Sequence, residues 1–140
     1  MKNALIGLDL GTTVCKDILV DERLKIIAQV DQYYPLVNIS GEEIEQDADL
    51  WWEISLQVLK QLMADPAAAS YDVLGISVST QGISFVPVDR SLNPLRNAFS
   101  WLDIRASEQM GRVLERFEEK ELFRITGKRA GSAYVLAKLL

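Results

Sequence analysis

The hydrophobic and polar positions at the start of the chain predict three consecutive strands. A mostly apolar run covers residues 4–10 and ends at Gly11-Thr12-Thr13, and apolar residues resume over 14–20 before an acidic turn. A third run, residues 24–30, alternates enough to predict another strand. Because both connections are short, we expect the three strands to pair as an antiparallel meander.

The pattern that follows becomes helical. Residues 33–39 contain Pro35, which has no N–H to donate to a sheet, so this stretch is predicted to be a loop or an edge segment. From residue 47 to residue 63, apolar side chains recur three and four positions apart. This spacing predicts a helix that begins at Asp47 and is stopped by Asp65-Pro66.

Strands are expected again after this helix, followed by two further helices. Residues 73–79 and 83–88 are typical of strands, on either side of Thr80-Gln81-Gly82. Residues 103–122 have the spacing of an amphipathic helix, and residues 130–140 predict a helix without a cap or a polar tail. Strands that alternate with helices indicate an α/β or α+β protein, and the apolar end leads us to expect part of a larger domain.

Composition excludes several classes of function. The 140 residues amount to about one domain, and the net charge of −5 without a basic cluster argues against nucleic-acid binding. With a single cysteine, Cys15, and no histidine, an internal disulfide, a zinc cluster and histidine-dependent catalysis are excluded. No apolar run reaches the ~20 residues of a membrane span. We expect no membrane association and a cytoplasmic protein.

The segment from Asp9 to Lys16 carries the clearest chemistry. An Asp at the end of a strand, followed by Gly11 and two threonines in a tight turn, is suited to a hydrated metal ion and to phosphate oxygens. Gly11 lets the backbone approach such a ligand, and Lys16 adds a positive charge. A hairpin turn with a solvated Asp is the alternative interpretation of the same residues.

The placement of Asp9-Leu10-Gly11-Thr12-Thr13 in a first hairpin resembles the phosphate-binding start of the actin, hexokinase and heat-shock ATPase superfamily. Further segments, in order and from residue 4 to the last residue, resemble the FGGY family of carbohydrate kinases. They are Asp47-Ala48-Asp49-Leu50-Trp51-Trp52, Gly75-Ile76-Ser77-Val78-Ser79-Thr80-Gln81-Gly82, Pro87-Val88-Asp89, Trp101-Leu102-Asp103-Ile104-Arg105 and Ile125-Thr126-Gly127.

The resemblance implies an α/β fold of the ribonuclease-H-like, actin-like ATPase type, with a mixed sheet that starts with the antiparallel meander and with flanking helices. Residues 1–140 would be part of the N-terminal kinase domain, truncated before the general base and the second lobe. The implied activity is ATP-dependent transfer of the γ-phosphoryl group to a hydroxyl of a sugar or polyol. We expect this stretch alone to be inactive, and marginally stable or oligomeric.

Site residues follow from the resemblance by position. Asp9 is implied in catalysis and as the Mg2+ ligand, whereas Gly11, Thr12, Thr13 and Lys16 are implied in binding the phosphates of ATP. The substrate side falls on Gln81, Gly82, Ile83, Trp101 and Asp103.

Two of the substrate-side residues also have structural interpretations. Trp101 can be a core aromatic residue and Asp103 a helix cap, and Arg105 is expected to be a structural partner of Asp103. At Gly82-Ile83, where glycerol kinases carry Arg-Glu and xylulose kinases Met-His, neither residue offers a side-chain hydrogen bond. A glycerol or D-xylulose substrate is therefore not implied.

Two other classes of protein stay open at this point. A non-catalytic sensor could use the same ribonuclease-H-like fold to bind a ligand, and retention of Mg-ATP binding by the full-length protein would separate the kinase from such a sensor. A structural module whose turn binds nothing is the other class. The Trp-x-Asp-x-Arg match argues against the structural module. Expected partners are a small sugar or polyol, with no nucleic acid and no membrane, and a homo-oligomer is left open.

Overall fold

A computed structural model describes all 140 residues and divides them into two compact units. The first unit comprises residues 1–36 and 47–81, and the second comprises residues 37–46 and 82–140. None of the helices combines the length and apolar character needed to span a bilayer.

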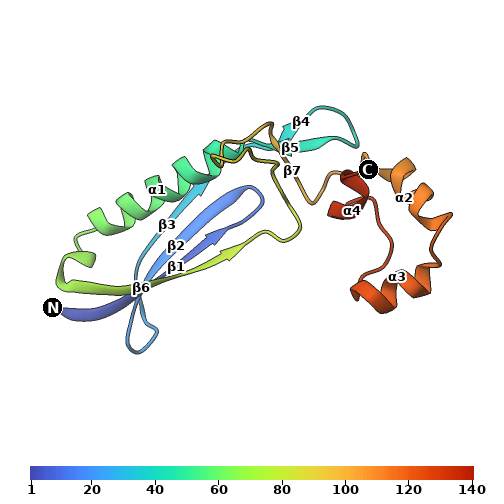
Figure 1. The fold of residues 1–140 in the computed structure, drawn as a ribbon. Coiled ribbons are helices and arrows are strands. Elements are labelled where there is room, and N and C mark those ends of the chain that lie inside the picture. Colours follow the sequence, from blue (N-terminus) through green and yellow to red (C-terminus); the bar gives the residue numbers. More distant parts are fainter. The chain divides into compact units, whose positions relative to one another are not determined.

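The first unit is built on a four-stranded mixed sheet (Figure 1). Its strand order is β3-β2-β1-β6, with β1 antiparallel to β2, β2 antiparallel to β3, and β6 parallel to β1. The predicted meander and the strand predicted over residues 73–79 are thus confirmed. The strands are β1 (Lys2–Leu10), β2 (Val14–Asp21), β3 (Ile26–Tyr33) and β6 (Tyr71–Thr80).

The third strand begins and ends later than residues 24–30. The Asp21 carboxylate accepts the backbone N–H groups of Arg23 at 2.9 Å and Lys25 at 3.0 Å, and Leu24 has a φ of 59°. These hydrogen bonds extend the turn as far as Lys25. The strand therefore starts only at Ile26.

Helix α1 (Ala48–Ala64) runs along one face of this sheet and covers β1, β2 and β3 (Figure 1). Its N-cap is Asp47, whose side chain accepts from the backbone N–H groups of Asp49 and Leu50, and its C-cap is Asp65. Both predicted ends of the helix are confirmed, and a 3-10 turn (Ala68–Ser70) leads to β6. The core beneath the helix includes Ala4, Ile6, Leu8, Cys15, Leu19, Ala28, Tyr34, Ile54, Val58 and Leu62.

The second unit contains a small sheet of order β4-β5-β7, formed by β4 (Val37–Asn38), β5 (Ile44–Gln46) and β7 (Ala98–Phe99). The strand predicted over residues 83–88 is wrong. Only two isolated bridges occur there, from Phe85 to Phe99 and from Val88 to Pro94. Ile83 has a φ of 56°, outside the range of a strand, and Pro87 has no N–H to donate.

Three short helices complete this unit: α2 (Ser107–Leu114), α3 (Glu119–Thr126) and α4 (Val135–Lys138). The single helix predicted over residues 103–122 is wrong, because Glu118 has the extended backbone of an N-cap and separates α2 from α3. Of the helix predicted over residues 130–140, only α4 forms. These helices surround a small core of Ala106, Met110, Val113 and Ala137.

Candidate functional site

A row of polar residues crosses the sheet of the first unit near the end of β1. Asp9 pairs with Lys16 on β2 and with Ser79 on β6, and Lys16 pairs with Asp31 on β3. Leu8 is buried on the side of α1, so Asp9 points to the opposite face, where it is exposed. Paired positions share a face. From β6 to β3, this face therefore carries the Ser79 hydroxyl, the Asp9 carboxylate, the Lys16 ammonium group and the Asp31 carboxylate side by side.

The turn between β1 and β2 is tight and requires a glycine. The Gly11 N–H donates to the Val14 carbonyl at 3.0 Å, and a Cβ at Gly11 would lie 2.9 Å from the same oxygen. Thr13 is exposed on this turn, and Thr12 is partly buried. The structure thus brings the predicted phosphate-side residues together between the carboxyl end of β1 and the start of β2.

Tyr34 contacts this turn from within the core. Its hydroxyl donates to the Gly11 carbonyl, and its backbone N–H donates to the Thr13 carbonyl at 3.0 Å. Burial raises the pKa of Tyr34 to about 12, with Cys15 and Asp9 adding to the shift, so the phenol stays protonated. Sequence reasoning missed Tyr34, because a tyrosine in a predicted loop gives no local signal of such a contact.

Gln81 joins the turn through the backbone. Gln81 directly follows β6, and its N–H donates to the Leu10 carbonyl at 2.9 Å. This residue, predicted on the substrate side, therefore lies beside the phosphate-side turn. Gly82, Ile83, Trp101 and Asp103 belong to the second unit.

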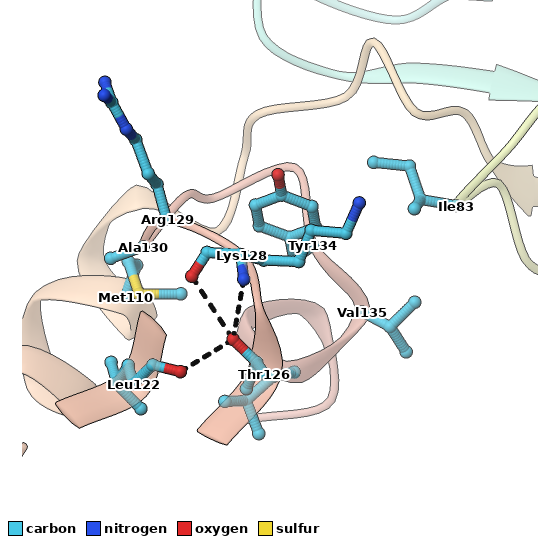
Figure 2. Close-up of a pocket in the computed structure, with 10 residues that line it drawn as sticks. Ile83, Met110, Leu122, Thr126, Lys128, Arg129, Ala130, Tyr134 and Val135 are labelled. Atoms are coloured by element: carbon cyan, nitrogen blue, oxygen red, sulfur yellow. Dashed lines mark hydrogen bonds between the residues drawn. The ribbon is translucent and has the colours of Figure 1, made fainter. Parts of the chain in front are cut away.

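The second unit contains a cavity of about 280 Å³ that the sequence did not predict (Figure 2). Ile83 lines this cavity. Its backbone is in the left-handed region, which a β-branched residue rarely adopts. Thr126 closes one side, with its hydroxyl donating to the Leu122 carbonyl at 2.7 Å. The walls are mainly apolar, with two basic residues, and include Met110, Leu122, Lys128, Arg129, Ala130, Tyr134, Val135 and Leu136.

Trp101 and Asp103 differ in their surroundings. Trp101 is 41% exposed, which leaves part of its ring accessible for packing, and its backbone N–H donates to the Ser84 hydroxyl oxygen at 3.0 Å. The Asp103 side chain is fully buried and accepts from the Ile44 N–H at 2.9 Å and from the Arg105 Nε at 2.8 Å. The expected partnership of Arg105 with Asp103 is confirmed. Contact of Asp103 with a substrate stays a prediction.

Asp103 is part of a buried cluster of charged residues. Arg105 also contacts Glu45 at 2.8 Å, and Arg96 contacts the same Glu45 oxygen. The buried Lys138 ammonium donates to the Ser100 carbonyl at 2.9 Å and lies 3.9 Å from Asp103. Burial opposes ionisation of Asp103, but the hydrogen bonds from Arg105 and Ile44 hold its pKa below the usual range.

A second buried carboxyl group lies in the first unit and was not singled out from the sequence. Asp17 on β2 is fully buried, with one oxygen 3.9 Å from the Cys15 sulfur and the other without a hydrogen-bond partner. Burial raises the pKa of Asp17 to about 6. It also raises the pKa of the Cys15 thiol to about 11, and the nearby Asp17 adds to that shift, so this thiol is not a reactive thiolate.

The residues at the turn fit a magnesium–nucleotide complex better than a free metal ion. No group of three or more acidic or cysteine side chains comes together to hold a metal. Mg2+ is commonly bound by one or two carboxylates, water and substrate phosphates, and Asp9 offers one exposed carboxylate beside Lys16.

Comparisons with known proteins agree with the fold. The model of the FGGY family of carbohydrate kinases, N-terminal domain, matches residues 4–140. A xylulose kinase from Bacillus subtilis (strain 168) is 34% identical over 136 residues, covering 97% of this chain and 27% of that protein. The chain belongs to the FGGY family of carbohydrate kinases, and it matches the family's N-terminal domain.

Solved structures show the same relationship. The crystal structure of gluconate kinase from Lactobacillus acidophilus superposes with a TM-score of 0.91 at 25% identity, covering 99% of this chain and 28% of that chain. Ligand-bound xylulose kinase from the same organism gives a TM-score of 0.89 at 26% identity, covering 98% and 27%. The fold is thus the mixed α/β fold of sugar kinases, and the chain spans about a quarter of the length of these relatives.

Proposed function

We propose that these residues are the N-terminal part of an ATP-dependent kinase that transfers the γ-phosphoryl group to a hydroxyl of a sugar or polyol. The observation that carries this proposal is the placement of Asp9 opposite Lys16, beside the turn at Gly11. A carboxylate and an ammonium group next to exposed turn atoms suit the positioning and charge stabilisation on which phosphoryl transfer depends.

Each phosphate-side residue has a distinct part in this proposal. Backbone and hydroxyl groups of Gly11, Thr12 and Thr13 bind phosphate oxygens, and Lys16 balances their negative charge. Asp9 holds Mg2+ through water and orients the attacking hydroxyl. The bound Mg2+ supplies charge neutralisation at the phosphates.

The substrate side of the proposal rests on the second unit and Gln81. The exposed part of the Trp101 ring suits the C–H surface of a sugar or polyol. Gly82 and Ile83 offer hydrogen bonds from backbone groups only, and Ile83 lines the cavity of Figure 2. Asp103 acts on substrate directly only if it leaves its contacts with Arg105, whereas in the described arrangement it fixes the segment that carries Trp101.

Further parts of the proposal concern the whole protein. The general base and the second lobe would lie in the length of chain that the relatives have in addition, so residues 1–140 alone would not phosphorylate a sugar. The full-length protein would be cytoplasmic, would bind no nucleic acid or membrane, and a homo-oligomer fits the same proposal.

The decisive experiment screens the full-length protein against ketoses, aldoses, polyols and sugar acids in a coupled assay of ADP release. We expect Mg-ATP-dependent turnover with at least one compound, and none from residues 1–140 alone. A full-length protein that binds one of these compounds but not Mg-ATP would favour a ligand-binding sensor. Absence of Mg-ATP binding would contradict the proposal, and sugar phosphorylation by residues 1–140 would contradict the requirement for a second lobe.

A further inference from the structure

Tyr34 holds the phosphate-side turn at two of its carbonyl groups, those of Gly11 and Thr13. The side-chain hydroxyl donates to the Gly11 carbonyl, and the backbone N–H donates to the Thr13 carbonyl at 3.0 Å. We propose that Tyr34 is a positioning residue that sets the turn in its phosphate-binding conformation, an inference that rests on the proposed kinase function.

The planarity of the peptide bond explains how a buried tyrosine can act on the ligand side of the turn. In a trans peptide, the carbonyl of one residue and the N–H of the next point in opposite directions. The chain has no cis peptide bond, so a Gly11 carbonyl held toward Tyr34 directs the Thr12 N–H away from it. In the same way, the hydrogen bond to the Thr13 carbonyl directs the Val14 N–H away from the Tyr34 backbone.

Glycine makes this restraint necessary. Gly11 is required because any Cβ would lie 2.9 Å from the Val14 carbonyl, but a glycine also has more backbone freedom than other residues. Tyr34 is only 5% exposed and belongs to the core cluster formed with Leu8, Cys15, and Ile54 and Val58 of α1. Because this core fixes the ring, its hydroxyl can hold a flexible peptide at a defined orientation.

The adjacent Tyr33 provides a matched control. It is 74% exposed at the end of β3, and its side chain is not part of the core cluster. Tyr34→Phe removes one hydroxyl that contacts the turn, whereas Tyr33→Phe removes one that faces solvent. Any effect common to both variants would therefore not come from the turn.

The test measures MgADP affinity, the KM values for ATP and sugar, and amide hydrogen exchange in the full-length protein. We expect Tyr34→Phe to weaken MgADP binding by about 3- to 10-fold and to raise the KM for ATP similarly, with the KM for sugar unchanged. Without nucleotide, the peptide covering the turn should exchange faster in Tyr34→Phe only. Lower stability with unchanged MgADP affinity would make Tyr34 merely structural and would overturn the inference.

A measurement on the wild-type protein decides the matter if Tyr34→Phe does not fold. MgADP should then protect the segment around Tyr34 from hydrogen exchange together with residues 10–14, and protection of residues 10–14 alone would overturn the inference. A wild-type protein that binds no MgADP would contradict the kinase function and the Tyr34 inference together. Wild-type binding that Tyr34→Phe fully retains would overturn the role of Tyr34 alone.

Discussion

Asp9 on β1 lies directly opposite Lys16 on β2, on the face of the sheet that α1 does not cover. The pairing places a carboxylate and an ammonium group at the same end of the first hairpin as the glycine-containing turn. Since cross-strand partners share a face, both groups can act on one ligand. The nucleotide binding proposed for this motif has its physical basis in this pairing.

Asp9→Asn should lower the turnover of the full-length protein by at least ~10²-fold while keeping the fold, because the isosteric amide loses the charge that positions metal and hydroxyl. The measurement is kcat in the coupled ADP assay, with circular dichroism to verify folding. Asp31→Asn, which removes the other exposed carboxylate beside Lys16, serves as the control and should change turnover far less. Turnover near wild type in folded Asp9→Asn would remove Asp9 from the mechanism.

Gly11→Ala should raise the KM for ATP by ~10-fold or more, with a small effect on the KM for sugar. The added Cβ would lie 2.9 Å from the Val14 carbonyl, a backbone atom that cannot move without distorting the turn. Gly41→Ala is the control, since nothing lies within 4 Å of its Cβ position. Steady-state kinetics with each substrate varied separately gives the comparison, and equal KM values for ATP in both variants would contradict the prediction.

Asp103→Ala should lower the free energy of unfolding by roughly 3–5 kcal/mol, because it leaves the buried Lys138 charge without its carboxylate partner and leaves Arg105 with Glu45 alone. Urea unfolding measures this effect. Glu108→Ala breaks an exposed pair with Arg112 and should change stability by less than ~1 kcal/mol. If Asp103→Ala instead kept its stability and raised only the KM for sugar, Asp103 would be a substrate ligand.

Asp17→Asn should stabilise the protein at neutral pH. The pKa of Asp17 is raised by burial from 3.8 to about 6, so the folded state keeps its proton to a higher pH than the unfolded chain does. Stability therefore decreases as the pH rises from about 4 to about 6 and stays lower above it, by up to about 3 kcal/mol.

Urea unfolding at pH 4.5 and pH 8 tests this sign. From pH 4.5 to pH 8, the free energy of unfolding of the wild type should fall relative to that of Asp17→Asn. Asp31→Asn, which changes an exposed residue, should show the same fall as the wild type. A wild type whose stability changes with pH as in Asp17→Asn would show that Asp17 ionises normally in the folded state.

Local signals were sufficient for the first hairpin and for α1. The cap at Asp47 and the stop at Asp65-Pro66 depend on hydrogen bonds and backbone restrictions within a few residues, so the sequence predicts both ends of α1. The turn at Gly11 is similarly local, because its closing hydrogen bond reaches only Val14.

Contacts between distant residues were not predictable in this way. Tyr34 contacts Gly11, which is 23 positions away in the sequence, and Arg105 contacts Glu45, which is 60 positions away. The amphipathic spacing over residues 103–122 favours one helix, but the chain is held in turns at Asp103 by its hydrogen bond to Ile44. Tertiary contacts there outweigh helix propensity.

The charged cluster around Glu45 also limits which substitutions this sequence can accept during evolution. One Glu45 oxygen contacts both Arg96 and Arg105, and Asp103 contacts Arg105 and lies near Lys138. Loss of Glu45 removes the carboxylate that Arg96 and Arg105 share, and loss of Asp103 leaves the buried Lys138 without its carboxylate partner. These positions should therefore be inherited as a set, conserved together or exchanged together for uncharged residues, while exposed pairs such as Glu108 and Arg112 vary independently.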